Sequence, residues 1–232
     1  MTVDLSYGDV EATLARLNRI AEDKRVAFRA RLKHFQRLGF PPGVNTGTGK
    51  RAIYTFPLLL MMAFATEFAQ AGMAPKRIVK TLSANWNEVE WSLLIALTPE
   101  ELFDRWTPSI DANKLVWMLS PESLRDLSEE GEGEYDYHES IRIEKLEDLP
   151  SIMMNDDEGS PIIGEFYRHL IIQVRPFLMV VMGHIIAVRP DLEPTDLWLD
   201  LEQRLVERGR QLKEMIDTID VRMKLNGDDQ EA

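Results

Sequence analysis

The chain has 232 residues, of which 44% are hydrophobic and 28% charged, as is ordinary for a globular protein that buries its own core. It contains no cysteine, which excludes disulfides and cysteine-ligated zinc or iron–sulfur sites. The net charge of −12 is unevenly divided, because residues 1–87 carry 13 Lys and Arg against 6 Asp and Glu, whereas residues 88–232 carry 14 against 33.

The first 82 residues predict a series of helices around one glycine-rich loop. Apolar residues recur at helical spacing in four segments, residues 9–21, 25–38, 56–71 and 73–82. Gly39 ends the second segment, because prolines follow at positions 41 and 42. Residues 43–49 form the loop, and residues 52–54 are a candidate strand returning from it. Thr55 is a candidate cap for the third helix.

Beyond residue 86 the pattern predicts a mixed α/β region. Strands are expected at residues 114–119, 141–144 and 167–174. Helices are expected at residues 100–106, 176–188 and 194–224, and residues 90–96 fit either a strand or a helix. Polar, largely acidic sequence predicts surface loops at residues 128–140 and 155–160.

The most apolar run, residues 170–188, predicts buried core rather than a membrane span. It is interrupted by Gln173, Arg175, Pro176 and His184, whereas a span needs about 20 residues with few or no charges. The start of the sequence has neither the basic nor the apolar segment of a signal peptide. We therefore expect a cytoplasmic protein with no membrane partner.

One stretch of the basic half lacks acids altogether. From Lys24 to Thr66 there is no carboxylate, yet this stretch carries eight lysines and arginines. A cationic face of this kind is what a phosphate backbone selects. We expect its charge to be uncompensated in the folded protein and to lie against nucleic acid; the alternative is a solvated cationic face with no partner.

Three short motifs make this expectation more specific. Residues 33–39 (KHFQRLG) end the second predicted helix, residues 49–54 (GKRAIY) precede the third, and residues 68–73 (FAQAGM) end the third. In this order, within residues 8–82, they resemble the winged helix-turn-helix domain of the MerR family of DNA-binding regulators. Lys33 stands where the family has an arginine, and His34 stands where it has the first of two aromatics. The cysteines of the metal-sensing members are absent.

The resemblance implies a bacterial, sequence-specific transcriptional regulator that binds double-stranded DNA. Its fold would be α+β and mostly helical, with a winged helix-turn-helix at residues 1–85. An acidic, mixed α/β regulatory and dimerisation region, ending in a long helix, would follow at residues 86–232. In a helix-turn-helix the second helix enters the major groove. The expected DNA-binding residues are Lys24, Arg25, Arg29, Lys33, His34, Arg37, Lys50 and Arg51.

The last predicted helix carries a partial heptad repeat. Trp198, Leu205, Leu212 and Ile219 recur every seven residues, although Arg208 and Gly209 interrupt the stripe. This spacing favours a homodimer seam, which would match two recognition helices to two half-sites. An amphipathic helix packed on its own chain explains the spacing equally well.

Other classes of function have less support in the sequence. A winged helix that no longer binds DNA and instead docks a protein is the main alternative. The C-terminal region is a candidate site for a protein or small-molecule effector. No nucleophile–base pair, metal-ligand spacing or phosphate-binding loop is present, because Arg51 stands where such a loop needs Ser or Thr. We therefore expect no enzymatic activity, no metal and no cofactor.

Overall fold

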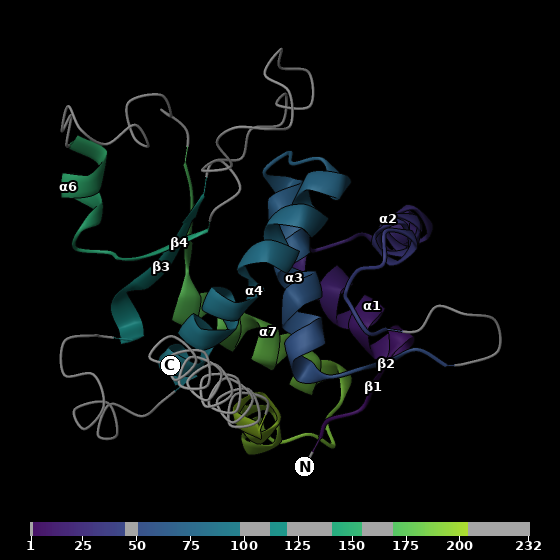
Figure 1. The fold of residues 1–232 in the computed structure, drawn as a ribbon. Helices are drawn as coiled ribbons and strands as arrows, with labels where there is room; N and C mark the ends of the chain where they lie inside the picture. Colours follow the sequence, from purple (N-terminus) through teal and green to yellow (C-terminus); the bar gives the residue numbers. More distant parts are fainter. Residues whose placement is uncertain (1, 45–50, 98–111, 120–140, 155–168, 204–232) are drawn as a thin grey trace, which may run out of the picture.

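The computed structural model describes residues 2–44, 51–97, 112–119, 141–154 and 169–203 (Figure 1). Within these ranges the protein is mostly helical and has two small antiparallel sheets, one of two strands and one of three. The predicted class, α+β and mostly helical, is confirmed for this part of the chain.

The N-terminal elements alternate short strands with helices. In chain order they are β1 (Leu5–Ser6), α1 (Tyr7–Leu17), the 3-10 turn Glu22–Lys24, α2 (Arg25–Arg37), β2 (Ile53–Tyr54) and α3 (Phe56–Gln70). β1 pairs antiparallel with β2, with Leu5 opposite Tyr54, so the chain returns to its own start just before α3. The predicted second and third helices are confirmed to within one residue at their ends.

The first helix is shorter than predicted. A reciprocal cap opens α1, because Ser6 Oγ accepts from the Asp9 amide and Asp9 Oδ2 accepts from the Ser6 amide. The helix ends at Leu17 rather than at residue 21, because the Asn18 side chain donates to the Leu14 carbonyl and Arg19 turns the chain at a φ of 51°. An apolar pattern could not reveal this turn, since Ile20 continues the stripe beyond it.

The fourth helix is much longer than predicted. α4 (Pro75–Leu97) continues past Leu82 and includes residues 90–96, which the sequence left open between strand and helix. No glycine or proline interrupts it after Pro75, and Val89 and Leu93 continue its buried face. The predicted division between residues 1–85 and 86–232 therefore falls within a continuous helix. The division itself stays a prediction.

The C-terminal elements build a small sheet that packs against one apolar helix. They are a 3-10 turn (Ala112–Lys114), β3 (Leu115–Leu119), β4 (Arg142–Lys145), α6 (Leu149–Met154), β5 (Leu170–Gln173) and α7 (Val174–Val188), followed by helical residues 194–203. β3 is the central strand, antiparallel to β4 and β5, and all five of its residues are buried.

Some of these elements differ from the prediction. β5 ends at Gln173, because Val174, predicted as the last residue of a strand at residues 167–174, begins α7. α7 begins two residues before Pro176, because proline is tolerated in a first helical turn. α6 was not predicted. The predicted helix at residues 100–106, the loops at 128–140 and 155–160, and the last helix beyond residue 203 lie outside the described residues. In the described ranges, no helix has the length and apolar character needed to cross a membrane.

The core is continuous from the first helix to the last. One hydrophobic cluster contains Leu14 of α1, Phe64 of α3, Trp117 of β3 and Leu178 of α7. The Trp117 ring lies 4.3 Å from that of Phe64, centroid to centroid, and its Nε1 donates to Ser92 Oγ over 2.7 Å. α1 packs directly against α7. α2 lies at the periphery, on the side away from β3 and β4 (Figure 1).

Candidate nucleic-acid interface

α2 has one buried face and one cationic face. Phe28, Leu32 and Phe35 recur at helical spacing and are buried. The predicted site residues Lys33, His34 and Arg37 lie elsewhere on the helix and are exposed. Among the described residues, none of these three has an ion-pair partner. The structure thus places these side chains where a polyanion could reach them.

Arg25 and Arg29, which are also among the expected DNA-binding residues, are differently placed. Arg25 Nη1 lies 3.0 Å from Glu11 Oε1, and Arg29 Nε lies 3.5 Å from the same oxygen. Glu11 belongs to α1 and is buried. The expectation that the basic stretch is uncompensated is therefore wrong for these two arginines. Their role in DNA binding stays a prediction.

The remaining predicted cations flank α2 at its start and at the following strand. Lys24 pairs with Asp23 over 3.1 Å, and both side chains are exposed. Water screens such a pair strongly, so Lys24 keeps most of its charge available. Arg51 is exposed just before β2, and Lys50 lies outside the described residues. Arg31 and Val26 are also exposed on α2, although the sequence singled out neither.

A side-chain hydrogen bond connects α2 to β2. Gln36 Nε2 donates to the hydroxyl oxygen of Tyr54 over 2.6 Å. Burial raises the pKa of Tyr54, and the hydrogen bond from Gln36 offsets part of that rise. The neighbouring Tyr7 hydroxyl is buried without a hydrogen-bond partner in the described part of the chain. The strand that follows residues 45–50 is thus fixed to the cationic helix.

A carboxylate from the C-terminal half caps α3. Thr55 occupies the predicted cap position, but its side chain makes no capping hydrogen bond. Instead the amide of Phe56 donates to Asp200 Oδ2 over 2.8 Å, across 144 positions in the chain. Pro57 follows Phe56 and has no amide hydrogen to offer. The acceptor is therefore a buried carboxyl oxygen supplied by another helix.

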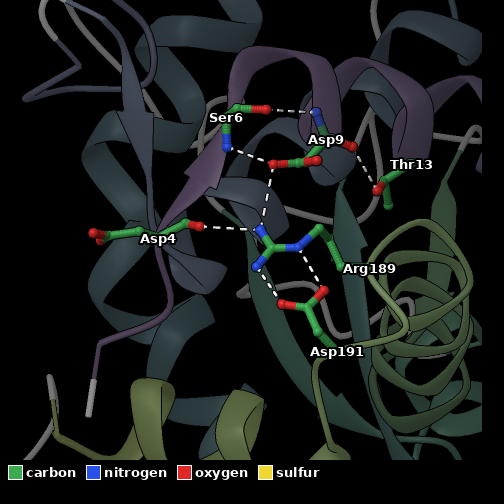
Figure 2. Close-up of polar contacts among 6 residues, drawn as sticks. All are labelled: Asp4, Ser6, Asp9, Thr13, Arg189 and Asp191. Carbon is green, nitrogen blue, oxygen red and sulfur yellow. Dashed lines mark hydrogen bonds and ion pairs between the residues drawn. The ribbon is translucent and has the colours of Figure 1, made fainter.

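Arg189 connects the end of α7 to the start of α1 (Figure 2). Its Nε and Nη2 donate to the two carboxylate oxygens of Asp191, over 2.8 and 2.6 Å. Its Nη1 lies 3.3 Å from the Asp4 carbonyl and 3.5 Å from Asp9 Oδ2. Partial burial raises the pKa of Asp9, but the hydrogen bonds with Ser6 and the charge of Arg189 outweigh it, so this pKa lies below its usual range.

The predicted dimer seam is described only at its first residue. Trp198 is partly buried, and Leu205, Leu212 and Ile219 lie outside the described residues. Up to residue 203 this helix packs on its own chain through Leu197, Asp200 and Leu201. The homodimer stays a prediction.

The sequence could not reveal three residues that hold the N-terminal helices in place through distant contacts, namely Glu11, Arg189 and Asp200. Each acts on a group at least 14 positions away in the chain. Within the described residues, no group of three or more His, Cys, Asp or Glu could hold a metal ion. Comparison with protein-family models, curated proteins and solved structures finds no match to this chain.

Proposed function

We propose that this protein is a sequence-specific, DNA-binding transcriptional regulator whose N-terminal elements form a MerR-like winged helix-turn-helix. The observation that carries the proposal is the exposed cationic face of α2, with Lys33, His34 and Arg37 free of ion pairs among the described residues. A helix of 13 residues suits the major groove, which is about 12 Å wide.

The order of the elements supports a wing beside the helix. Residues 38–52 lie in the chain between α2 and β2, and β2 pairs with β1 and is hydrogen-bonded to α2 through Gln36 and Tyr54. Lys50 and Arg51 would then contact the backbone or the minor groove, while α2 occupies the major groove. The acidic C-terminal region would dimerise the protein or bind an effector.

The exposed residues of α2 suggest a division of labour. Lys33, His34 and Arg37 would contact phosphates, which give affinity without sequence information. Val26, 75% exposed in the first turn, would supply an apolar contact of the kind that thymine methyl groups accept.

A second candidate is a winged helix that docks a protein instead of DNA. The observation favouring it is Glu11, which compensates two of the arginines that a DNA-binding helix would use. The exposed Val26 also fits a protein surface. These two candidates differ in how binding depends on salt, because phosphate contacts release counterions.

Binding to labelled duplex DNA, measured by fluorescence anisotropy over a series of salt concentrations, tests the proposal. The test variant is Lys33→Glu with Arg37→Glu. We expect it to bind at least about tenfold more weakly and to lower the slope of log K against log salt by about 2, because each lost phosphate contact removes about 0.9.

The matched control is Lys76→Glu with Lys145→Glu, which makes the same charge change on α4 and β4. It should keep most of the affinity. Absence of salt-dependent binding by the unsubstituted protein would overturn the DNA-binding proposal. Equal losses in the two variants would show that total charge matters and the α2 face does not.

A further inference from the structure

Glu11 is a buried acid directed at the proposed DNA-binding helix. Its residue exposure is 8%, and acidic residues are almost never buried so deeply unless they are paired. It belongs to α1, whose other buried positions, such as Leu14, face the core. Both partners of its carboxylate, Arg25 and Arg29, belong to the first two turns of α2.

One carboxylate oxygen serves two guanidinium groups. Glu11 Oε1 accepts a hydrogen bond from Arg25 Nη1 at 3.0 Å and lies 3.5 Å from Arg29 Nε. The Arg25 side chain is only 20% exposed, whereas that of Arg29 is 49% exposed. The contacts therefore hold both side chains at one end and leave part of Arg29 turned to solvent.

The contact with Glu11 lowers both the net charge of this cluster and the conformational entropy of the two arginine side chains. Two cations and one anion carry a single net positive charge, so fewer phosphates are attracted. At the same time a guanidinium that is already oriented loses less entropy when it forms a directed hydrogen bond. Phosphate attraction is blind to sequence, whereas guanidinium contacts to guanine edges are not.

We propose that Glu11 is a positioning residue that sets the DNA selectivity of α2. It holds Arg25 and Arg29 in the orientation needed for base contacts, and it weakens their attraction to phosphates of any sequence. This inference rests on the proposed function, because it assigns a role within DNA recognition.

Glu11→Gln tests the role, because glutamine keeps the size of the side chain and one acceptor oxygen while removing the charge. A duplex selected from a random pool by the unsubstituted protein is compared with a scrambled duplex of equal length and composition. We expect the affinity ratio between the two to fall at least about tenfold. Binding to the scrambled duplex should strengthen, and its salt slope should steepen by about 0.9 for one added phosphate contact.

Glu22→Gln is the matched control. Glu22 lies 3.5 Å from Arg25 Nε, but its side chain is 90% exposed, so the substitution makes the same charge change beside the same arginine in open solvent. It should leave the affinity ratio within about twofold of the unsubstituted protein, because exposed pairs are weak.

A second variant covers the case in which Glu11→Gln does not fold. Arg29→Lys keeps the charge but removes the planar fork, so the affinity ratio should fall while the salt slope stays the same. In addition, the Arg25 and Arg29 side-chain N–H resonances of the DNA-free protein report directly on the pairing. They should be resolved in the unsubstituted protein and exchange-broadened in Glu11→Gln.

The outcomes separate the two proposals. If the unsubstituted protein binds both duplexes without selectivity or not at all, the proposed function fails, and the role of Glu11 fails with it. If selective binding is present and both Glu11→Gln and Arg29→Lys keep the ratio unchanged, only the role of Glu11 is overturned.

Discussion

Two partly buried carboxylates, Asp9 and Glu67, differ in whether their surroundings favour the charged form. Asp9 gains hydrogen bonds and a nearby cation, which lower its pKa despite partial burial. Glu67 on α3 is partly buried and has no ion-pair partner in the described residues, so burial raises its pKa. The first residue is stabilised as an anion by its surroundings, whereas the second is not.

Glu67→Gln should therefore stabilise the protein at neutral pH. The pKa of Glu67 is higher in the folded protein than in the unfolded chain, where it is about 4.3, so the folded state binds this proton more tightly. The stability that Glu67 contributes is therefore lost as the pH rises from about 4.3 through the folded-state pKa. The substitution removes this cost at pH 7 and should have little effect below about pH 3, where both states are protonated. Urea unfolding at the two pH values provides the measurement.

Glu88→Gln, an exposed substitution on α4, is the comparison and should change stability by less than about 0.5 kcal/mol. A gain for Glu67→Gln of the same size in acid and at neutral pH would contradict the burial argument.

Single residues were predicted well where helical period decides their position. Lys33 and Arg37 are exposed as expected, because Phe28, Leu32 and Phe35 fix the buried face of α2. The state of Arg25 and Arg29 could not be predicted in the same way. Their partner is on a separate helix, and no pattern within α2 indicates which residue of α1 it meets.

The ends of helices could be predicted where a residue near the end in sequence determines them. Gly39, with a φ of 77°, follows the end of α2 as predicted, and Gly72, with a φ of 89°, follows the end of α3. The start of α3 and its cap position, Thr55, were predicted correctly. The capping acceptor was not, because Asp200 rather than the Thr55 side chain accepts from the Phe56 amide. The length of α4 was not predicted, because residues 90–96 fit either a strand or a helix. Their helical state depends on the packing of Val89 and Leu93 in the core.

Asp200→Ala should destabilise the protein by about 1–3 kcal/mol, because it leaves the buried Phe56 amide without its acceptor. Asp200→Asn keeps an acceptor oxygen and loses the charge that favours a helix N-terminus, so its loss should be smaller. The free energy of unfolding in urea measures both.

Gln203→Ala, an exposed substitution on the same helix, serves as the reference. It should change the unfolding free energy by less than about 0.5 kcal/mol. Equal losses for Asp200→Ala and Gln203→Ala would mean that the amide finds another partner.

The whole molecule is organised by contacts between its first and last described parts. α1 packs on α7, and Trp117 of β3 packs against Phe64 of α3 and Phe177 of α7. The sequence predicted the α+β class and most of the elements. It could not predict this assembly, because pairings over more than a hundred residues depend on how every intervening element packs.

Leu14→Ala should lower the stability of the N-terminal helices and of the C-terminal sheet together. Leu14 is fully buried in the shared cluster, so the expected loss is about 2–5 kcal/mol. If the core unfolds as one unit, the backbone amides of β3 should lose as much hydrogen-exchange protection as those of α3. Unchanged protection in β3 would mean that the halves open independently.

Met179→Ala is the corresponding exposed substitution on α7. It should change protection in either half by less than about 0.5 kcal/mol.

The long-range contacts of Asp200 and Arg189 have a practical consequence for anyone dissecting this protein. A truncated fragment that stops after α4 would retain the cationic helix but leave the Phe56 amide uncapped and the side of α1 that meets α7 stripped of its cover. Such a fragment should aggregate, because the exposed apolar surface of α1 would bind other copies. Its failure to bind DNA would then report on damaged architecture rather than on the binding surface.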